Sequence, residues 1–243
     1  MIFLFKKKKQ ALFKGLIDFH NHILPGIDDG SKSIAQSLEM LNLFEQLEIN
    51  TLIASPHIYK DLYPNTPDTI SNAFDLLQNA AKSHPVNLRG YSAEYMVDEF
   101  FMAEVNKGHV LLPCFRSYLL LEIPFFGALN ILDEALFVLL NKEYLPILAH
   151  PERYTTLKNI NQVKDLKQKG AKMQLNALSL LGYYGKDIQK KASNWLKHGV
   201  YDFVCTDAHN PYQLKQLHNL KLDKKELMAW DGLRENHLML FNN

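Results

Sequence analysis

The 243-residue sequence predicts an α/β protein in which a parallel sheet closes into a barrel. Short runs rich in β-branched and aromatic residues alternate with longer stretches of helical period, as in βαβ units. Seven such units follow one another without a break, which favours a closed barrel over an open sheet. No linker rich in Pro, Gly or Ser divides the chain, so we expect one domain over residues 16–243, preceded by a tail over residues 1–15.

Each expected strand is a short apolar run that ends at polar residues. In order, the strands are Leu16–Phe19, Thr51–Ser55, Asn87–Ala93, Tyr118–Ile123, Leu145–Ala149, Lys172–Leu175 and Asp202–Cys205.

The expected helices lie between these strands. Their ranges are Ile34–Glu48, Thr69–Lys82, Ala128–Asn141, Asn161–Lys169 and Lys186–His198. Ser31 or Ser33 can cap the first of them, because a serine hydroxyl accepts from the backbone amides of a first turn. Gly170 and Gly199 stand where helices end at glycine.

Composition excludes several classes of protein. A formal net charge of +1 argues against a nucleic-acid binder, which needs a basic surplus. Cys114 and Cys205 are too few for a disulfide scaffold and indicate a reducing cytoplasm. No run approaches the roughly 20 apolar residues of a membrane span. The lysines at 6–9 form a solvated tail or, alternatively, a weak contact with an anionic membrane surface.

Histidines and carboxylates follow nearly every expected strand at its carboxyl end, where the active sites of parallel barrels lie. The set consists of five histidines and four acids: His20, His22, Asp29, His57, Glu94, Glu122, His150, Asp207 and His209. Four converging carboxylates repel one another unless cations lie between them. Imidazole and carboxylate without thiolate suit Mn, Fe or Zn, and nine ligands suit two or three divalent ions. Such a centre attracts an anion, and a phosphate ester is the expected substrate.

Individual motifs are weaker than the set. Asp28, Asp29 and Gly30 by themselves predict a turn. Glu122 is more informative, because a charge within an apolar strand is rarely buried without a partner. The remaining histidines lie in expected loops or helices, and we interpret them as surface or capping residues: His84, His109, His198, His218 and His237.

These motifs together resemble the PHP (polymerase and histidinol phosphatase) superfamily. The resemblance is carried by the segments DFHNHILPGIDDG from Asp18, HPERY from His150 and DAHN from Asp207, with His57, Glu94 and Glu122 between them. Within the superfamily, the sequence is similar to bacterial capsular-polysaccharide tyrosine phosphatases of the CpsB/YwqE type from about Leu16 onward. The resemblance implies a distorted TIM-like (β/α)7 barrel with a trinuclear metal centre.

The resemblance also implies a division of the ligands. One metal would take His20, His22, Asp207 and either Glu94 or Glu122. A second would take Asp29, His57 and His209, and the third would take His150 with the glutamates. Manganese is the first expectation, with iron or zinc as alternatives.

The implied reaction is in-line attack of an activated water on a phosphotyrosine, with Arg153, His150 and Asp207 as catalytic residues. Arg153 matches an arginine that contacts phosphate in this family. A second such arginine is expected shortly after the DAHN segment, but only Lys215 stands there. Candidates for contact with the phenyl ring are aromatic: Tyr59, Tyr63, Phe125 and Phe126, although packing at the barrel rim explains them equally well.

The function expected from these features is a metal-dependent protein-tyrosine phosphatase whose substrate is a membrane-associated tyrosine kinase of capsule synthesis. A small-molecule phosphatase of the histidinol-phosphate type and an inert binding module are the alternatives. The cysteine-based route is excluded, because neither Cys114 nor Cys205 has an arginine six positions later. The oligomeric state does not follow from the sequence.

Overall fold

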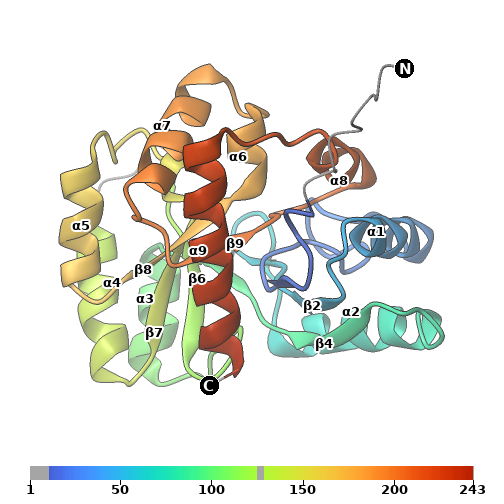
Figure 1. The fold of residues 1–243 in the computed structure, drawn as a ribbon. Coiled ribbons are helices and arrows are strands. Elements are labelled where there is room, and N and C mark those ends of the chain that lie inside the picture. Colours follow the sequence, from blue (N-terminus) through green and yellow to red (C-terminus); the bar gives the residue numbers. More distant parts are fainter. Residues whose placement is uncertain (1–10, 125–128, 243) are drawn as a thin grey trace, which may run out of the picture.

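The computed structural model describes residues 11–124 and 129–242, and its strands occupy the middle of the molecule with helices around them (Figure 1). The strands are β1 (Ile17–Asp18), β2 (Thr51–Ala54), β3 (His57–Ile58), β4 (Asn87–Tyr91), β5 (Glu94–Met96), β6 (Tyr118–Glu122), β7 (Leu145–Ala149), β8 (Lys172–Asn176) and β9 (Phe203–Cys205). The helices are α1 (Ile34–Gln46), α2 (Pro67–Ala80), α3 (Glu99–Lys107), α4 (Asn130–Asn141), α5 (Ile160–Gln168), α6 (Ala177–Leu181), α7 (Lys186–Lys197), α8 (Pro211–Leu217) and α9 (Lys224–Asn242), with a 3₁₀ turn, η1, at Pro151–Arg153.

The strands form two parallel sheets, so the expectation of an α/β protein with parallel pairing is confirmed. One sheet has the order β1-β2-β4 and the other has the order β3-β5-β6-β7-β8-β9. Among the described residues the pairing does not run as one closed ladder. Two features connect the sheets, because β3 follows β2 after two residues and an isolated parallel bridge joins Asn21 to Ala208.

Two expected strands end one or two residues early, and a further short strand that was not expected follows each of them. The run Thr51–Ser55 ends at Ala54, and β3 begins only after Pro56, which has no N–H to donate to a ladder. The run Asn87–Ala93 ends at Tyr91, and β5 begins at Glu94. Backbone hydrogen bonds from Ser92 to Ala54 and from Glu94 to Pro56 keep these segments side by side.

The helices expected from the sequence are present, and their ends differ by at most two residues. Ser33 caps α1 by accepting from the amide of Gln36. Gly170 and Gly199 adopt the left-handed backbone expected of them, with φ of 101° and 64°. Three described helices of seven or more residues were not expected: α3, α8 and α9.

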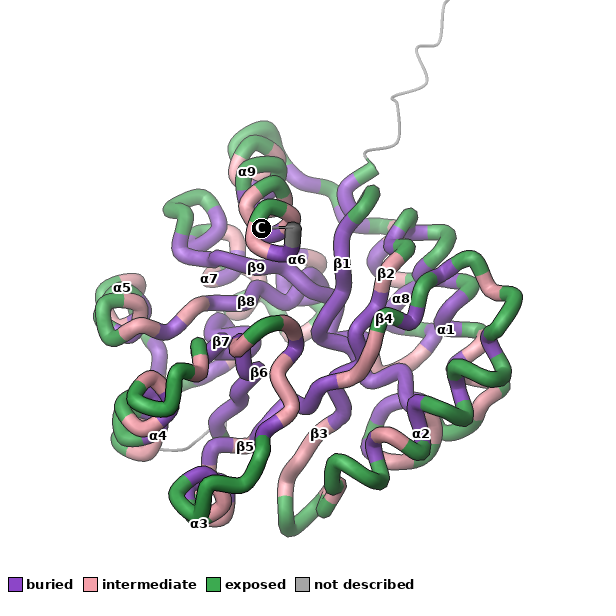
Figure 2. Tube along the Cα trace, turned by 90° about the horizontal axis from the view of Figure 1, so that it is seen from below, coloured by how far each residue is buried: buried purple, intermediate pink, exposed green. Residues whose placement is uncertain are grey.

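Buried side chains form two hydrophobic clusters. Figure 2 shows the strands as mostly buried stretches of the chain, with exposed stretches on the surrounding helices. The larger one lies between strands and helices and includes Phe44, Leu121 and Trp195. The smaller one, here named the aromatic cluster, draws on strands of both sheets and on α9: Ile17, Phe19, Ile53, Cys114, Tyr118, Leu120, Ile147, Ala149, Phe203, Cys205 and Phe241. Side chains two residues apart share a face of a strand, so pairs in this cluster such as Phe203 and Cys205 lie on the same side of their strand.

The expected tail is wrong in its last five residues. Leu12 and Phe13 are buried, and the Phe13 ring meets Trp230 of α9 edge-on at 5.4 Å. The indole N–H of Trp230 donates to the carbonyl of Leu12 at 2.9 Å. Apolar side chains next to the lysine run therefore belong to the folded domain, whereas residues 1–10 lie outside the described residues.

Within the described ranges, no helix combines the length and the apolar character that crossing a bilayer requires.

Candidate metal centre

Two histidines emerge from β1 with their rings toward the same side. The residue between them, Asn21, donates its amide to the carbonyls of Asp18 and Ile53, at 3.1 Å each, which fixes the backbone. Alternate residues of an extended chain share a face, so His20 and His22 point together. Both are fully buried.

The first group of ligand-type atoms surrounds these two rings. It consists of His20, His22, Glu94 and Asp207, all buried. His20 Nε2 lies 3.1 Å from Glu94 Oε2 and 3.2 Å from Asp207 Oδ1. His22 Nε2 lies 3.3 Å and 3.4 Å from the same two oxygens. Two nitrogens and two oxygens therefore converge on one point.

A second group forms at the solvent side of the first. It consists of His22, Asp29, His57 and His209. Asp29 Oδ1 lies 3.5 Å from His57 Nε2 and 3.5 Å from His209 Nε2. The rings of His22 and His209 stack at 3.9 Å. Asp29 is 46% exposed, so this group is reachable from solvent.

A third group consists of His57, Glu94 and Glu122. His57 Nδ1 lies 2.9 Å from Glu122 Oε1 and 3.3 Å from Glu94 Oε2. His150 is placed against the other oxygen of Glu94, with Nε2 at 3.2 Å from Oε1. Glu94 thus belongs to both the first and the third group of ligand-type atoms. The sequence alone did not indicate which glutamate is shared between groups.

The geometry of these contacts suits metal ions. Among the described residues, four buried atoms in the middle of the cluster have no hydrogen-bond partner: His20 Nε2, His22 Nε2, His57 Nδ1 and Glu94 Oε2. The three nitrogens lie 3.1 to 3.3 Å from Glu94 Oε2, but none of them forms a hydrogen bond with it. Buried polar atoms without partners are costly. Imidazole nitrogens and carboxylate oxygens within 4.8 Å of one another form a donor set for Mn, Fe or Zn.

The cluster favours positive charge. Burial alone would lower the pKa of His20, but the carboxylates of Glu94 and Asp207 outweigh burial and raise that pKa to about 10. Burial would raise the pKa of Asp207, but the attraction of His20 and the close approach of the His22 ring hold that pKa well below its usual range. The carboxylates therefore stay ionised and stabilise cations between them.

The outer nitrogens of the two buried histidines have partners that the sequence did not single out. Asp28 Oδ2 lies 2.8 Å from His22 Nδ1, and Gln174 Oε1 lies 2.9 Å from His20 Nδ1. A partner at Nδ1 selects the tautomer that leaves Nε2 free to bind a metal. Asp28 was interpreted from the sequence as part of a turn, and it does accept from the amide of Gly30 at 2.9 Å. In addition, it orients the ring of His22.

Gly30 is required by close packing. A Cβ at this position would lie 2.1 Å from the carbonyl oxygen of His22, closer than any side chain allows. The segment Asp28–Gly30 therefore folds directly against the histidine pair.

Backbone strain occurs at two of the clustered residues. His150 has φ of 34° and Asp207 has φ of 51°, in the left-handed region that residues other than glycine avoid. Such conformations persist only where the surroundings enforce them, and they collect at functional sites.

Arg153 lies beside the cluster on η1. Its Nη1 donates to Asp207 Oδ2 at 2.8 Å, and its guanidinium stacks on the Tyr184 ring at 4.2 Å. Asn176 donates to the same Asp207 oxygen at 2.7 Å and to the Tyr184 hydroxyl at 3.1 Å. One cation is thus held at the edge of the cluster, where an anionic substrate would meet it.

Comparison with known proteins agrees with this arrangement. The family model for capsular polysaccharide synthesis, CpsB/CapC, matches residues 16–217. The chain belongs to the CpsB/CapC family.

Individual relatives match most of this chain. It is 29% identical to the putative tyrosine-protein phosphatase CapC of Staphylococcus aureus, covering 93% of this chain and 92% of the relative. It is 31% identical to the tyrosine-protein phosphatase YwqE of Bacillus subtilis, covering 80% and 78%. A solved structure, described as YwqE from Bacillus subtilis and CpsB from Streptococcus pneumoniae, unique metal-dependent tyrosine phosphatases, matches with a TM-score of 0.77 at 29% identity, covering 94% of this chain and 95% of that one.

The structure of this CpsB/CapC protein separates the residues predicted to bind substrate. The Tyr63 ring stacks on His57 at 5.3 Å, and Tyr59 pairs with Tyr63 through the backbone. Lys215 contacts the exposed Glu39 of α1 at 2.8 Å and none of the clustered residues. Phe125 and Phe126 lie outside the described residues. Roles of all these residues, and of the nine clustered ones as ligands, stay predictions.

One histidine interpretation was wrong. His237 is fully buried beside the aromatic cluster, where its ring stacks on Phe241 at 5.3 Å. Burial lowers the pKa of His237 to about 3, since backbone hydrogen bonds oppose this only weakly. The sequence missed this because α9 itself was not expected.

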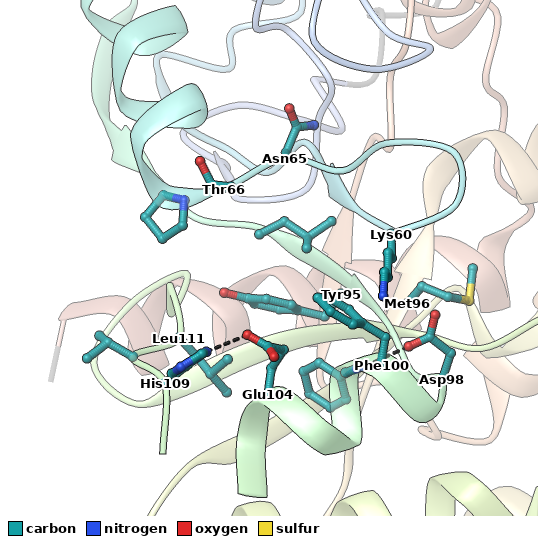
Figure 3. Close-up of a pocket in the computed structure, with 14 residues that line it drawn as sticks. Lys60, Asn65, Thr66, Tyr95, Met96, Asp98, Phe100, Glu104, His109 and Leu111 are labelled. Carbon is teal, nitrogen blue, oxygen red and sulfur yellow. Dashed lines mark hydrogen bonds and ion pairs between the residues drawn. The ribbon is translucent and has the colours of Figure 1, made fainter. Parts of the chain in front are cut away.

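A cavity of about 360 Å³ is lined by Tyr95 of β5 and Phe100 of α3, among others (Figure 3). Strand alternation sends Glu94 into the cluster and the next side chain, Tyr95, into this cavity. Two ionisable groups of its lining, Glu104 and His109, pair with each other. The cavity walls are mostly apolar, so its chemistry differs from that of the cluster.

Proposed function

We propose that this chain is a metal-dependent protein-tyrosine phosphatase that removes phosphate from a bacterial tyrosine kinase of capsule or exopolysaccharide synthesis. The observation that supports it most is the convergence of nine imidazole and carboxylate side chains beside one arginine. Relatives named tyrosine-protein phosphatase support this choice over a histidinol-phosphate type of enzyme. Both cysteines are free, which suits a cytoplasmic location.

The proposed cofactor is a set of two or three divalent ions, with manganese first and iron or zinc as alternatives. His20, His22, Glu94 and Asp207 would hold one ion. Asp29, His57 and His209 would hold a second, and Glu122 with His57 and Glu94 provides donors for a third. His150 Nε2, which lies 3.2 Å from the other oxygen of Glu94, would add one further donor to this set.

When bound, the ions supply an activated water and offset charge on the phosphate. The residues of the chain do the rest. Arg153 donates to an equatorial phosphate oxygen, and its position next to Asp207 places that oxygen at the cluster. The P–O bond to the tyrosine breaks in line with the attacking water. The phenol leaves with a pKa near 10, so it needs less proton donation than an alkoxide.

The proposed architecture behind this site is a single domain built as a distorted (β/α)7 barrel. The bridge from Asn21 to Ala208 and the aromatic cluster shared by both sheets support it. The domain would include residues 11–15 as well as the region from residue 16 onward, since Leu12 and Phe13 are buried.

The test compares substrates and one variant. Manganese-loaded protein should release phosphate from a phosphotyrosine peptide faster than from histidinol phosphate, and the opposite ranking would contradict the proposal. His150→Ala should lose at least about a hundredfold in activity, because outer-sphere changes alone cost 10–100-fold. His84→Ala is the matched control, since His84 contacts only Asn42 and Val86 on the surface. Metal content per chain is measured on all samples.

A further inference from the structure

Three tyrosines form a row of ring contacts that leads from Arg153 to the surface. The Tyr184 ring lies under the Arg153 guanidinium at 4.2 Å. Tyr183 meets Tyr184 edge-on at 5.1 Å, and Tyr212 of α8 lies 6.4 Å from Tyr183. Exposure rises along the row, to 39% at Tyr183 and 61% at Tyr212. No residue of this row was among the sites predicted from the sequence.

The inner end of the row holds the arginine in place. The Tyr184 hydroxyl is bonded to Asn176 at 3.1 Å, and Asn176 also binds the Asp207 oxygen that accepts from Arg153. Burial raises the pKa of Tyr184, so the ring stays neutral under the cation. Stacking on an aromatic face stabilises a guanidinium in one orientation. Tyr184 is therefore a positioning residue for Arg153.

The backbone at Tyr183 is held by local hydrogen bonds. Tyr183 lies between two glycines with left-handed backbone, Gly182 at φ of 81° and Gly185 at 102°. The amide of Gly182 donates to Ser179 and the amide of Tyr183 donates to Leu178, which ties the loop to α6. A Cβ at Gly182 would lie 3.0 Å from the Gln189 side chain, so glycine is needed there. Figure 1 shows α6 and α8 at the same end of the molecule.

Exposed tyrosines are typical of protein contact surfaces, because a large ring with few rotatable bonds loses little entropy on binding. We propose that Tyr183 and Tyr212 contact the polypeptide beside the phosphotyrosine, which makes them determinants of specificity for protein substrates over small aryl phosphates. The inference rests on the proposed phosphatase function. Its support is that the row is continuous with Arg153, the group that would bind the phosphate.

The decisive experiment compares two substrates on the metal-loaded full chain. One is a nine-residue phosphotyrosine peptide with leucines flanking the modified residue, and the other is p-nitrophenyl phosphate. The double variant Tyr183→Ser, Tyr212→Ser should raise KM for the peptide about tenfold, as expected for losing buried aromatic contacts. KM and kcat for p-nitrophenyl phosphate should stay within about twofold, because that ester reaches Arg153 without touching the outer row. Phe137→Ser, at an exposed ring on α4, is the matched control.

Two results would overturn the inference: equal changes for both substrates, or an unchanged KM for the peptide. Binding of a fluorescently labelled form of the same peptide, followed by anisotropy, tests the row without any turnover. If the wild-type protein hydrolysed neither substrate, the proposed function would fail, whereas an unchanged peptide affinity in the double variant would count against the row alone. Tyr184→Leu adds a further readout, since it should weaken inhibition by inorganic phosphate while Tyr184→Phe retains it.

Discussion

Two buried groups of side chains share the same strands and have opposite chemistry. Phe19 and His20 are consecutive, yet Phe19 packs against Phe203 at 5.3 Å while His20 lies 3.1 Å from Glu94. His20 is fully buried in the first group, and His237 is fully buried beside the aromatic cluster. Carboxylates raise the pKa of His20 to about 10, whereas burial lowers that of His237 to about 3.

The difference teaches that burial alone does not mark a functional histidine. The neighbours decide, because Glu94 and Asp207 provide charge around His20 and only backbone groups and aromatic rings surround His237. The cluster end of the strands is thus organised for cations, and the aromatic end for stability.

The largest expected effect comes from removing metal. Treatment with a chelator should lower phosphatase activity at least about a thousandfold, because the ions provide several kcal/mol of transition-state stabilisation. Manganese should restore it. Near-ultraviolet circular dichroism reports on the aromatic cluster and should change little. Activity that survives complete chelation would contradict a metal centre.

The next largest effect is expected on protein stability, from a change in the aromatic cluster. Phe19→Ala should lower the free energy of unfolding by about 3–5 kcal/mol, since Phe19 is fully buried and its loss leaves a cavity. Urea unfolding measures this, with Phe137→Ala as the control at an exposed ring. The folded variant should keep its metal content. If the Phe19→Ala variant lost its metal while keeping wild-type stability, the aromatic cluster and the metal-ligand cluster would not be independent of each other.

A smaller effect is expected outside the ligand groups. Asp28→Asn should weaken metal affinity about 10–100-fold, because Asp28 orients His22 through Nδ1. Competition with a fluorescent chelator measures the affinity. Asp133→Asn, at an exposed ion pair with Lys169, provides the control and should leave affinity unchanged. Equal affinities for both variants would remove Asp28 from the site.

The smallest effect concerns pH. The folded-state pKa of His237 is about 3, below its unfolded value, so the unfolded chain binds the extra proton as pH falls below about 6.5. This contribution to stability is present above that pH and is lost on acidification. Between about pH 7 and 5.5 it amounts to about 1 kcal/mol. His237→Gln should reduce the change in unfolding free energy between these two pH values by about 1 kcal/mol. An unchanged pH dependence in the variant would contradict this role of His237.

Much of the site followed from residue types and their positions. A histidine or acid after nearly every apolar run predicted the cluster, because parallel strands gather their carboxyl ends. Asn176 and Tyr184 escaped prediction, since an amide and a tyrosine have no single expected role at such positions. The predicted role of Lys215 in phosphate binding stays a prediction, and its side chain pairs with Glu39 on α1.

The sequence by itself determined the parallel α/β class and the nine polar residues that leave its strands, because strand periodicity and ligand chemistry are local properties. Only the tertiary structure decided that Glu94 is shared by two groups, that Asp28 supports His22, and that His237 is buried in an apolar environment. These facts depend on distances between segments far apart in the chain. No local pattern specifies such distances, since packing of the whole fold sets them.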